Sequence, residues 1–155
     1  MKAKEYLERA YWLDQMIDSK LEQVASLRAM ATKTTTIMKR DVVSRSRNLH
    51  GMEDTIAKIA DMEEEINADI ERLMELKREI GETIQRVEDP ELRVLLELRY
   101  LCFKEWPEIA RAIHRADSTI YKAHARALRA AKNVMEDEKQ SEKGRRKPEK
   151  AEKYS

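Results

Sequence analysis

The sequence is poor in the residues that build sheets, tight turns and disulfide frameworks. Its 155 residues include three glycines, three prolines and one cysteine, and aromatic residues account for only 5%. The single cysteine, Cys102, excludes an intramolecular disulfide framework and a multi-cysteine zinc site. Because Cys102 lies in an apolar helical run, we expect a packed, reduced thiol.

Long apolar runs are also missing. No stretch approaches the roughly 18 apolar residues of a membrane span, and the charged N-terminus lacks the apolar core of a signal peptide. We therefore expect a cytoplasmic protein with no membrane partner. The sequence contains no phosphate-binding loop, no nucleophile–base pair and no metal-ligand spacing. These absences argue against an enzyme, and we expect no cofactor and no metal.

What the sequence does contain is charge in a helical pattern. Charged residues make up 39% of the chain, which is typical of long, solvent-exposed helices. Apolar residues recur every three or four positions in two stretches, which predicts two amphipathic helices. In the first stretch they are Leu7, Ala10, Leu13, Ile17, Leu21, Val24 and Leu27. In the second they are Met52, Ile56, Ile59, Ile66, Ile70, Leu73, Ile80, Ile84 and Val87.

The two helices need partners for their apolar stripes. Residues 32–51 between them are rich in Thr, Lys and Arg and end in Gly51, which is typical of a basic, mobile connector. We therefore predict an antiparallel coiled-coil hairpin over residues 1–89, ended by Pro90. A parallel dimer through the second helix is the main alternative.

Charge is strongly segregated along the chain. Residues 53–89 contain thirteen acidic and five basic residues, a balance of −8. Residues 109–134 contain six Lys or Arg and one acid, a balance of +5. An acidic surface repels a DNA backbone, whereas a basic one attracts it. The C-terminal part is therefore the candidate for binding nucleic acid.

The stretch WPEIARAIHRADSTIYKAHARAL, residues 106–128, reads as two short helices joined by a polar turn. Pro107 suits the first turn of a helix, and Ile109, Ala110 and Ile113 would form its inner face. Residues 114–117 form the turn, after which Asp117 or Ser118 can cap the next helix. This order predicts a helix-turn-helix, in which a second helix enters the major groove by its N-terminal end. A generic helical corner is the alternative.

The side chains left facing outward carry the chemistry of DNA binding. Lys and Arg neutralise phosphates, while hydroxyl and aromatic groups near a helix N-terminus reach bases or backbone. The candidate DNA-binding residues are Arg111, Arg115, Ser118, Thr119, Tyr121, Lys122, Arg126 and Arg129. Trp106 is expected to anchor the first helix to the core.

The sequence DPELRVLLELRYL at residues 89–101, followed by residues 106–131, resembles the fourth region of sigma-70 class factors. His114 stands where that family has glycine in a left-handed turn, and Asp117 stands where arginine is common. The N-terminal half is similar to small proteins of phages infecting Gram-positive bacteria, which are grouped with late-gene transcriptional activators. Nothing resembles the sigma region that reads the −10 element.

The resemblance implies a regulator that binds promoter DNA and activates phage late genes by recruiting host RNA polymerase, in the bacterial cytoplasm. It also implies a homo-oligomer, expected to be a dimer, and a regulatory protein as a further partner. The coiled-coil half is expected to provide either dimerisation or a docking surface for RNA polymerase or another phage protein. The alternatives are a polymerase-binding adaptor without DNA readout and a terminase small subunit for DNA packaging.

The sequence thus predicts an all-α protein with three parts. They are a long antiparallel hairpin over residues 1–89, a small three-helix, sigma-region-4-like helix-turn-helix domain over residues 90–135, and a disordered charged tail over residues 136–155.

Overall fold

The computed structural model describes the backbone of residues 2–38 and 45–146 and the side chains of residues 2–33 and 50–145. Every regular element in these residues is a helix, so the predicted all-α fold is confirmed. No helix among them is long and apolar enough to cross a membrane. The chain divides into two units, which we call the hairpin unit, Trp12–Glu75, and the C-terminal unit, Met1–Tyr11 with Leu76–Ser155.

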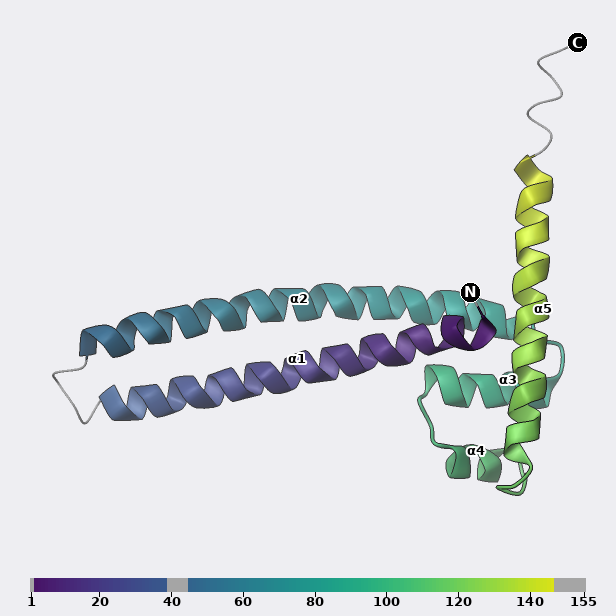
Figure 1. Ribbon diagram of the computed structural model, residues 1–155, viewed down its shortest axis with the longest axis horizontal. Helices are drawn as coiled ribbons and strands as arrows, with labels where there is room; N and C mark the ends of the chain where they lie inside the picture. Colours follow the sequence, from purple (N-terminus) through teal and green to yellow (C-terminus); the bar gives the residue numbers. More distant parts are fainter. Residues whose placement is uncertain (1, 39–44, 147–155) are drawn as a thin grey trace, which may run out of the picture. The chain divides into compact units, whose positions relative to one another are not determined.

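The hairpin unit consists of parts of α1 (Ala3–Met38) and α2 (Arg45–Gln85), which lie side by side and antiparallel (Figure 1). The ammonium group of Lys20 contacts the Asp69 carboxylate at 2.6 Å, and Arg28 pairs with Glu63. From the first pair to the second, the α1 residue advances from Lys20 to Arg28 while its α2 partner moves back from Asp69 to Glu63, as in an antiparallel pair. The predicted intramolecular hairpin is therefore confirmed.

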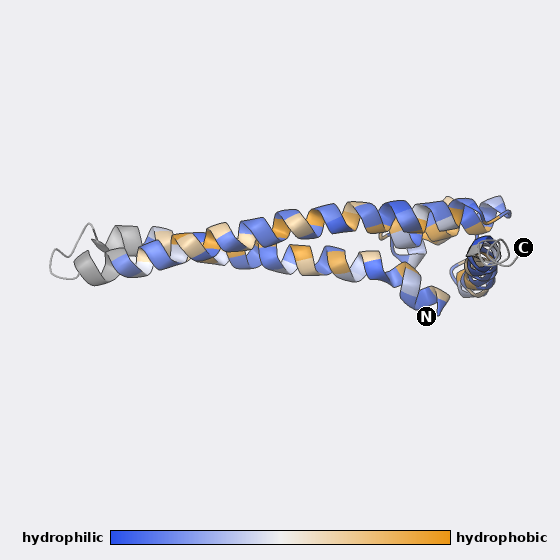
Figure 2. Cartoon of the chain, turned by 90° about the horizontal axis from the view of Figure 1, so that it is seen from above, coloured by the Kyte–Doolittle hydropathy of each residue, from blue (hydrophilic) through white to orange (hydrophobic). Residues whose placement is uncertain are grey.

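The seam of the hairpin is narrower than the predicted stripes. Figure 2 shows apolar residues recurring along both helices, and Ile17, Val24 and Ile66 are buried as expected. Leu21 and Ile70, however, remain 48% and 40% exposed. With a single partner helix, only the central positions of each heptad are fully covered, and the flanking positions lie at the edge of the seam.

Both helices extend into the segment predicted as a connector. That prediction, residues 32–51, is wrong at its two ends, because α1 continues to Met38 and α2 begins at Arg45; residues 39–44 lie outside the described residues. Threonine costs only a few tenths of a kcal/mol in an established helix. The hydroxyl groups of Thr32 and Thr55 donate to the carbonyls of Arg28 and Gly51, at 3.0 and 2.8 Å, so they do not interrupt the helix.

The C-terminal unit contains the three predicted short-domain helices. After α2 ends, the Asp89 carboxylate accepts from the Glu91 N–H at 2.9 Å and caps α3 (Pro90–Leu96), with Pro90 in its first turn. There follow α4 (Trp106–Ala112) and α5 (Ile120–Arg146). The core comprises residues of these helices together with residues near the start of α1 and the end of α2. They are Leu7, Ala10, Ile80, Ile84, Val87, Leu92, Leu95, Leu96, Tyr100, Ile109, Ile120, Ala123 and Ala127.

A π-helical turn, η1 (Glu97–Leu101), follows α3 and changes the surroundings of Cys102. The Cys102 N–H donates to the Glu97 carbonyl at 3.1 Å, and Phe103 then adopts a φ of 56°. The Phe103 ring packs against Tyr11, with centroids 5.8 Å apart, and lies 4.7 Å from the Lys77 ammonium. This turn leaves Cys102 exposed, so the expectation of a packed thiol is wrong.

The predicted disordered tail is helical over its first part. Helix α5 runs without a break to Arg146, and residues 147–155 lie outside the described residues. Glu, Lys, Gln and Arg are strong helix formers, and a helix already held by a core extends at little cost. A contact from the turn after α2 adds to this, because the Arg86 guanidinium contacts the Glu138 carboxylate at 2.9 Å.

Candidate nucleic-acid interface

Helices α4 and α5 form a corner at the end of the C-terminal unit (Figure 1). Ile109 and Ala110 of α4 and Ile120, Ala123 and Ala127 of α5 are all at most 1% exposed. Ile109 and Ala110 belong to the inner face that the sequence pattern predicted for the first of these helices. Since one face of each helix is fully buried, the opposite face of α5 is left to solvent.

The turn between the two helices has the geometry of a Schellman motif. The N–H of Arg115 donates to the Ala110 carbonyl at 2.8 Å, and that of His114 donates to the Arg111 carbonyl at 3.3 Å. His114 itself has a φ of 55°, in the left-handed region. A position that usually holds glycine in such turns is thus occupied by histidine, at a cost of roughly 1 kcal/mol.

Helix α5 begins later than the cap predicted at Asp117 or Ser118. Residues 117–119 form a turn, and the first helical residue is Ile120. The Thr119 carbonyl accepts from the N–H groups of Lys122 and Ala123 at 3.2 and 3.3 Å. The Thr119 hydroxyl donates back to the Ala116 carbonyl at 2.9 Å and closes the turn.

The eight candidate residues lie on α4, the turn and the first half of α5. Seven of them are exposed, and Thr119 is half-buried because its hydroxyl is turned into the loop. Lys122, Arg126 and Arg129 follow one another at spacings of four and three, so they share one face of α5. This exposed basic face is opposite the buried residues of the same helix.

Arg115 differs from the other candidates because it has a partner within the chain. Its guanidinium makes a two-point contact with the Glu91 carboxylate of α3, at 2.5 and 2.9 Å. The Arg115 hydrogen bond, with the nearby charge of Arg126, lowers the pKa of Glu91. A phosphate would therefore have to compete with Glu91 for Arg115. Sequence spacing gives no sign of this pair.

An aromatic cluster supports the start of α5. The Trp106 ring lies 4.5 Å from His124, 5.8 Å from Tyr121 and 4.5 Å from the Arg99 guanidinium. Trp106 thus anchors α4 to the core, as expected, and it also contacts Tyr121, which is 60% exposed. The ring of Tyr121 is held at the surface by a packed neighbour.

Two titratable groups in this cluster are held in their neutral forms. The Tyr100 hydroxyl and His124 Nε2 share a hydrogen bond of 2.7 Å. Burial, together with the charges of Lys4 and Arg99, lowers the pKa of His124 to about 4. Burial also raises the pKa of Tyr100 to about 12. At neutral pH the pair is uncharged, so His124 belongs to the core and not to the basic surface.

Within the described part of the chain, no three His, Cys, Asp or Glu residues come together in a way that could hold a metal ion. The groups that the corner of α4 and α5 presents to a ligand are therefore exposed cations, hydroxyls and one aromatic ring.

The fold and this corner define an all-α protein with a long helical hairpin and a small helical domain. A family model described as a protein of unknown function (DUF1492) matches residues 32–132, and the chain belongs to this family. No curated protein and no solved structure matches the chain.

Proposed function

We propose that the protein is a sequence-specific DNA-binding transcriptional regulator that contacts DNA through the turn before α5 and the first turns of α5. The observation that carries this proposal is the exposed basic face of Lys122, Arg126 and Arg129, on a helix whose other face is fully buried. A rigid helix with one cationic face is what a phosphate backbone needs in order to be held in one register.

Two of the other candidates suit contacts to bases. Ser118 and Tyr121 lie at the N-terminal end of α5, where a helix that enters the major groove end-on meets base edges. A hydroxyl can donate to or accept from bases, and an aromatic ring can contact the thymine methyl group. Arg111, on α4, would contact the DNA phosphate backbone beside the groove.

The resemblance to sigma region 4 supports a more specific role. We propose that the protein activates phage late genes in the cytoplasm of the bacterial host by recruiting RNA polymerase to the promoter. Self-association belongs to this proposal, as does a regulatory partner protein. The acidic α2, which would repel DNA, supports a division of labour in which the hairpin contacts protein.

Footprinting of the purified chain on late-promoter DNA, with and without polymerase, tests the proposal. The double variant Lys122→Ala, Arg126→Ala is expected to bind at least about tenfold more weakly, with a salt slope smaller by about two, because two phosphate contacts are lost. The matched control is Lys104→Ala, Lys143→Ala, which removes two exposed lysines elsewhere and should bind like the unaltered protein.

Two results would replace this function with another. Protection that requires polymerase and is indifferent to the Lys122 and Arg126 changes would make the protein an adaptor without DNA readout. A ring-sized assembly that binds DNA away from promoters would make it a packaging subunit.

A further inference from the structure

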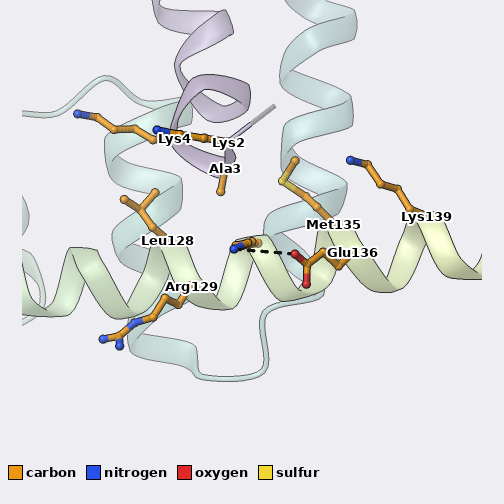
Figure 3. Close-up of a pocket in the computed structure, with 9 residues that line it drawn as sticks. Lys2, Ala3, Lys4, Leu128, Arg129, Met135, Glu136 and Lys139 are labelled. Atoms are coloured by element: carbon orange, nitrogen blue, oxygen red, sulfur yellow. Dashed lines mark ion pairs between the residues drawn. The ribbon is translucent and has the colours of Figure 1, made fainter.

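A cavity of about 500 Å³ lies between the first turn of α1 and the middle of α5, within the C-terminal unit (Figure 3). Its floor is apolar, because Leu128 and Met135 rise from α5 toward Ala3. Its rim carries one carboxylate and five cations. We call it the cationic cavity, and its charged residues are Glu136, Lys2, Lys4, Arg129, Lys132 and Lys139.

Much of the positive charge at this rim is not compensated. Lys132 pairs with Glu136 at 4.0 Å, and Lys4 pairs with Glu8 at 3.7 Å. Among the described residues, no carboxylate lies within ion-pair distance of the other three cations, Lys2, Arg129 and Lys139. Free cations around an apolar floor suit a negatively charged segment that also offers large apolar side chains.

DNA fits this cavity less well than protein does. A phosphate backbone makes no use of an apolar floor. Along α5, Met135 lies about 22 Å from Ile120 at 1.5 Å per residue, whereas a major groove is about 8.5 Å deep. A helix that enters the groove by its N-terminal end therefore holds the Met135 end of the cavity away from the duplex, whereas Arg129, at the other end, is also a candidate DNA contact.

The hairpin unit carries a surface of the complementary kind. Residues 59–71 contain six acidic residues and no basic one. Glu64 and Glu71 are exposed and have no ion-pair partner among the described residues, while Ile70 and Met74 are 40% and 67% exposed. Met74 lies three residues after Glu71 and four after Ile70, so these side chains are neighbours on the helix. We call these four residues the acidic ridge.

We propose that the cationic cavity receives the acidic ridge of a second copy of this chain. The charges are opposite, and apolar side chains on the ridge meet an apolar floor. Each copy carries both surfaces, so a dimer that contains this contact twice would leave neither surface open. The inference gives a surface to the self-association included in the proposed function, and it does not depend on DNA readout.

Sedimentation of the full chain in the absence of DNA, over a concentration series, tests this interface. The unaltered protein is expected to shift from 18.2 kDa to about twice that mass. The cavity variant Lys2→Glu, Lys139→Glu and the ridge variant Glu64→Lys, Glu71→Lys should each weaken association at least about tenfold, since like charges then face each other. An equimolar mixture of the two should associate again, because each contact regains opposite charges.

Two further variants separate charge at this site from charge elsewhere. Met74→Ser should weaken association without changing any charge. The control Asp18→Lys, Lys143→Glu reverses two exposed charges outside both surfaces and should associate normally. Circular dichroism verifies that each variant is helical.

Several outcomes overturn the inference. The first is an unaltered protein that stays monomeric at all concentrations. The second is a cavity variant or ridge variant that associates normally, and the third is an equimolar mixture of these two variants that stays monomeric. If the cavity variant loses DNA affinity and keeps its mass, the cavity belongs to the DNA surface and the inference is likewise wrong. Because no DNA is present in sedimentation, failure of the DNA-binding proposal is a separate result.

Discussion

The hairpin unit and the C-terminal unit show how differently the same apolar spacing can be used. In the hairpin each helix has one partner, and predicted stripe residues such as Leu21 and Ile56 stay 48% and 53% exposed. In the C-terminal unit several helices converge, and Leu95, Leu96 and Ile109 are 0% exposed. Burial therefore depends on the number of neighbouring helices as well as on the spacing of apolar residues.

The two units also differ in whether their enclosed polar pairs are charged or neutral. In the hairpin, Lys20 lies in the seam and contacts Asp69 at 2.6 Å and Glu65 at 3.6 Å. The Asp69 hydrogen bond raises the pKa of Lys20, so Lys20 stays charged. Such a pair within an apolar seam disfavours other registers of the two helices. In the C-terminal unit, by contrast, the hydrogen-bonded pair of the buried Tyr100 and the half-buried His124 is neutral.

The largest effect that would test this comparison is expected from truncating core leucines. Leu95→Ala should lower the free energy of unfolding by about 2–5 kcal/mol, because a fully enclosed side chain leaves a cavity. Leu21→Ala, at the edge of the seam, should cost about 1 kcal/mol or less. Urea denaturation followed by circular dichroism measures both. Equal losses would mean that the two units are packed alike.

The next effect concerns acid and is confined to the C-terminal unit. The pKa of His124 is lowered from 6.5 to about 4, so between these values the unfolded chain binds more protons than the folded one. Stability should thus fall as the pH drops through this window, by about 2 kcal/mol, since water partly screens the half-buried ring. Denaturation at a series of pH values measures the slope.

The acid effect has a matched control. His124→Leu should flatten the dependence on pH between these values, whereas His50→Leu, at an exposed position, should leave it unchanged. If both variants keep the slope of the unaltered protein, groups other than His124 cause the acid sensitivity.

The smallest effect concerns the turn of the helical corner. His114→Gly should raise the free energy of unfolding by about 1 kcal/mol, because glycine adopts a positive φ without strain. Ala125→Gly, within α5, should lower it by a similar amount. If His114→Gly instead lowers the free energy of unfolding, contacts of the imidazole stabilise the fold by more than the left-handed backbone costs.

Part of the candidate site could be read from the sequence, and part could not. Short-range spacing sufficed to place Ala110 on the buried face of α4 and Lys122 on the exposed face of α5, because a helix repeats every 3.6 residues. The resemblance to sigma region 4, and not the spacing, singled out His114, whose backbone is left-handed. The contact of Arg115 with Glu91 joins residues 24 apart, and no local pattern encodes it.

Local periodicity and composition were enough to specify the helices, their apolar faces and the separation of acidic from basic surface, because each of these depends on residues close together in the chain. Tertiary packing settled which stripe residues are covered, how far α5 extends and where Cys102 lies. It also brought the first turn of α1 to the middle of α5 around a cationic cavity. These features depend on which helices pack together, and such long-range contacts are set by the free energy of the whole fold.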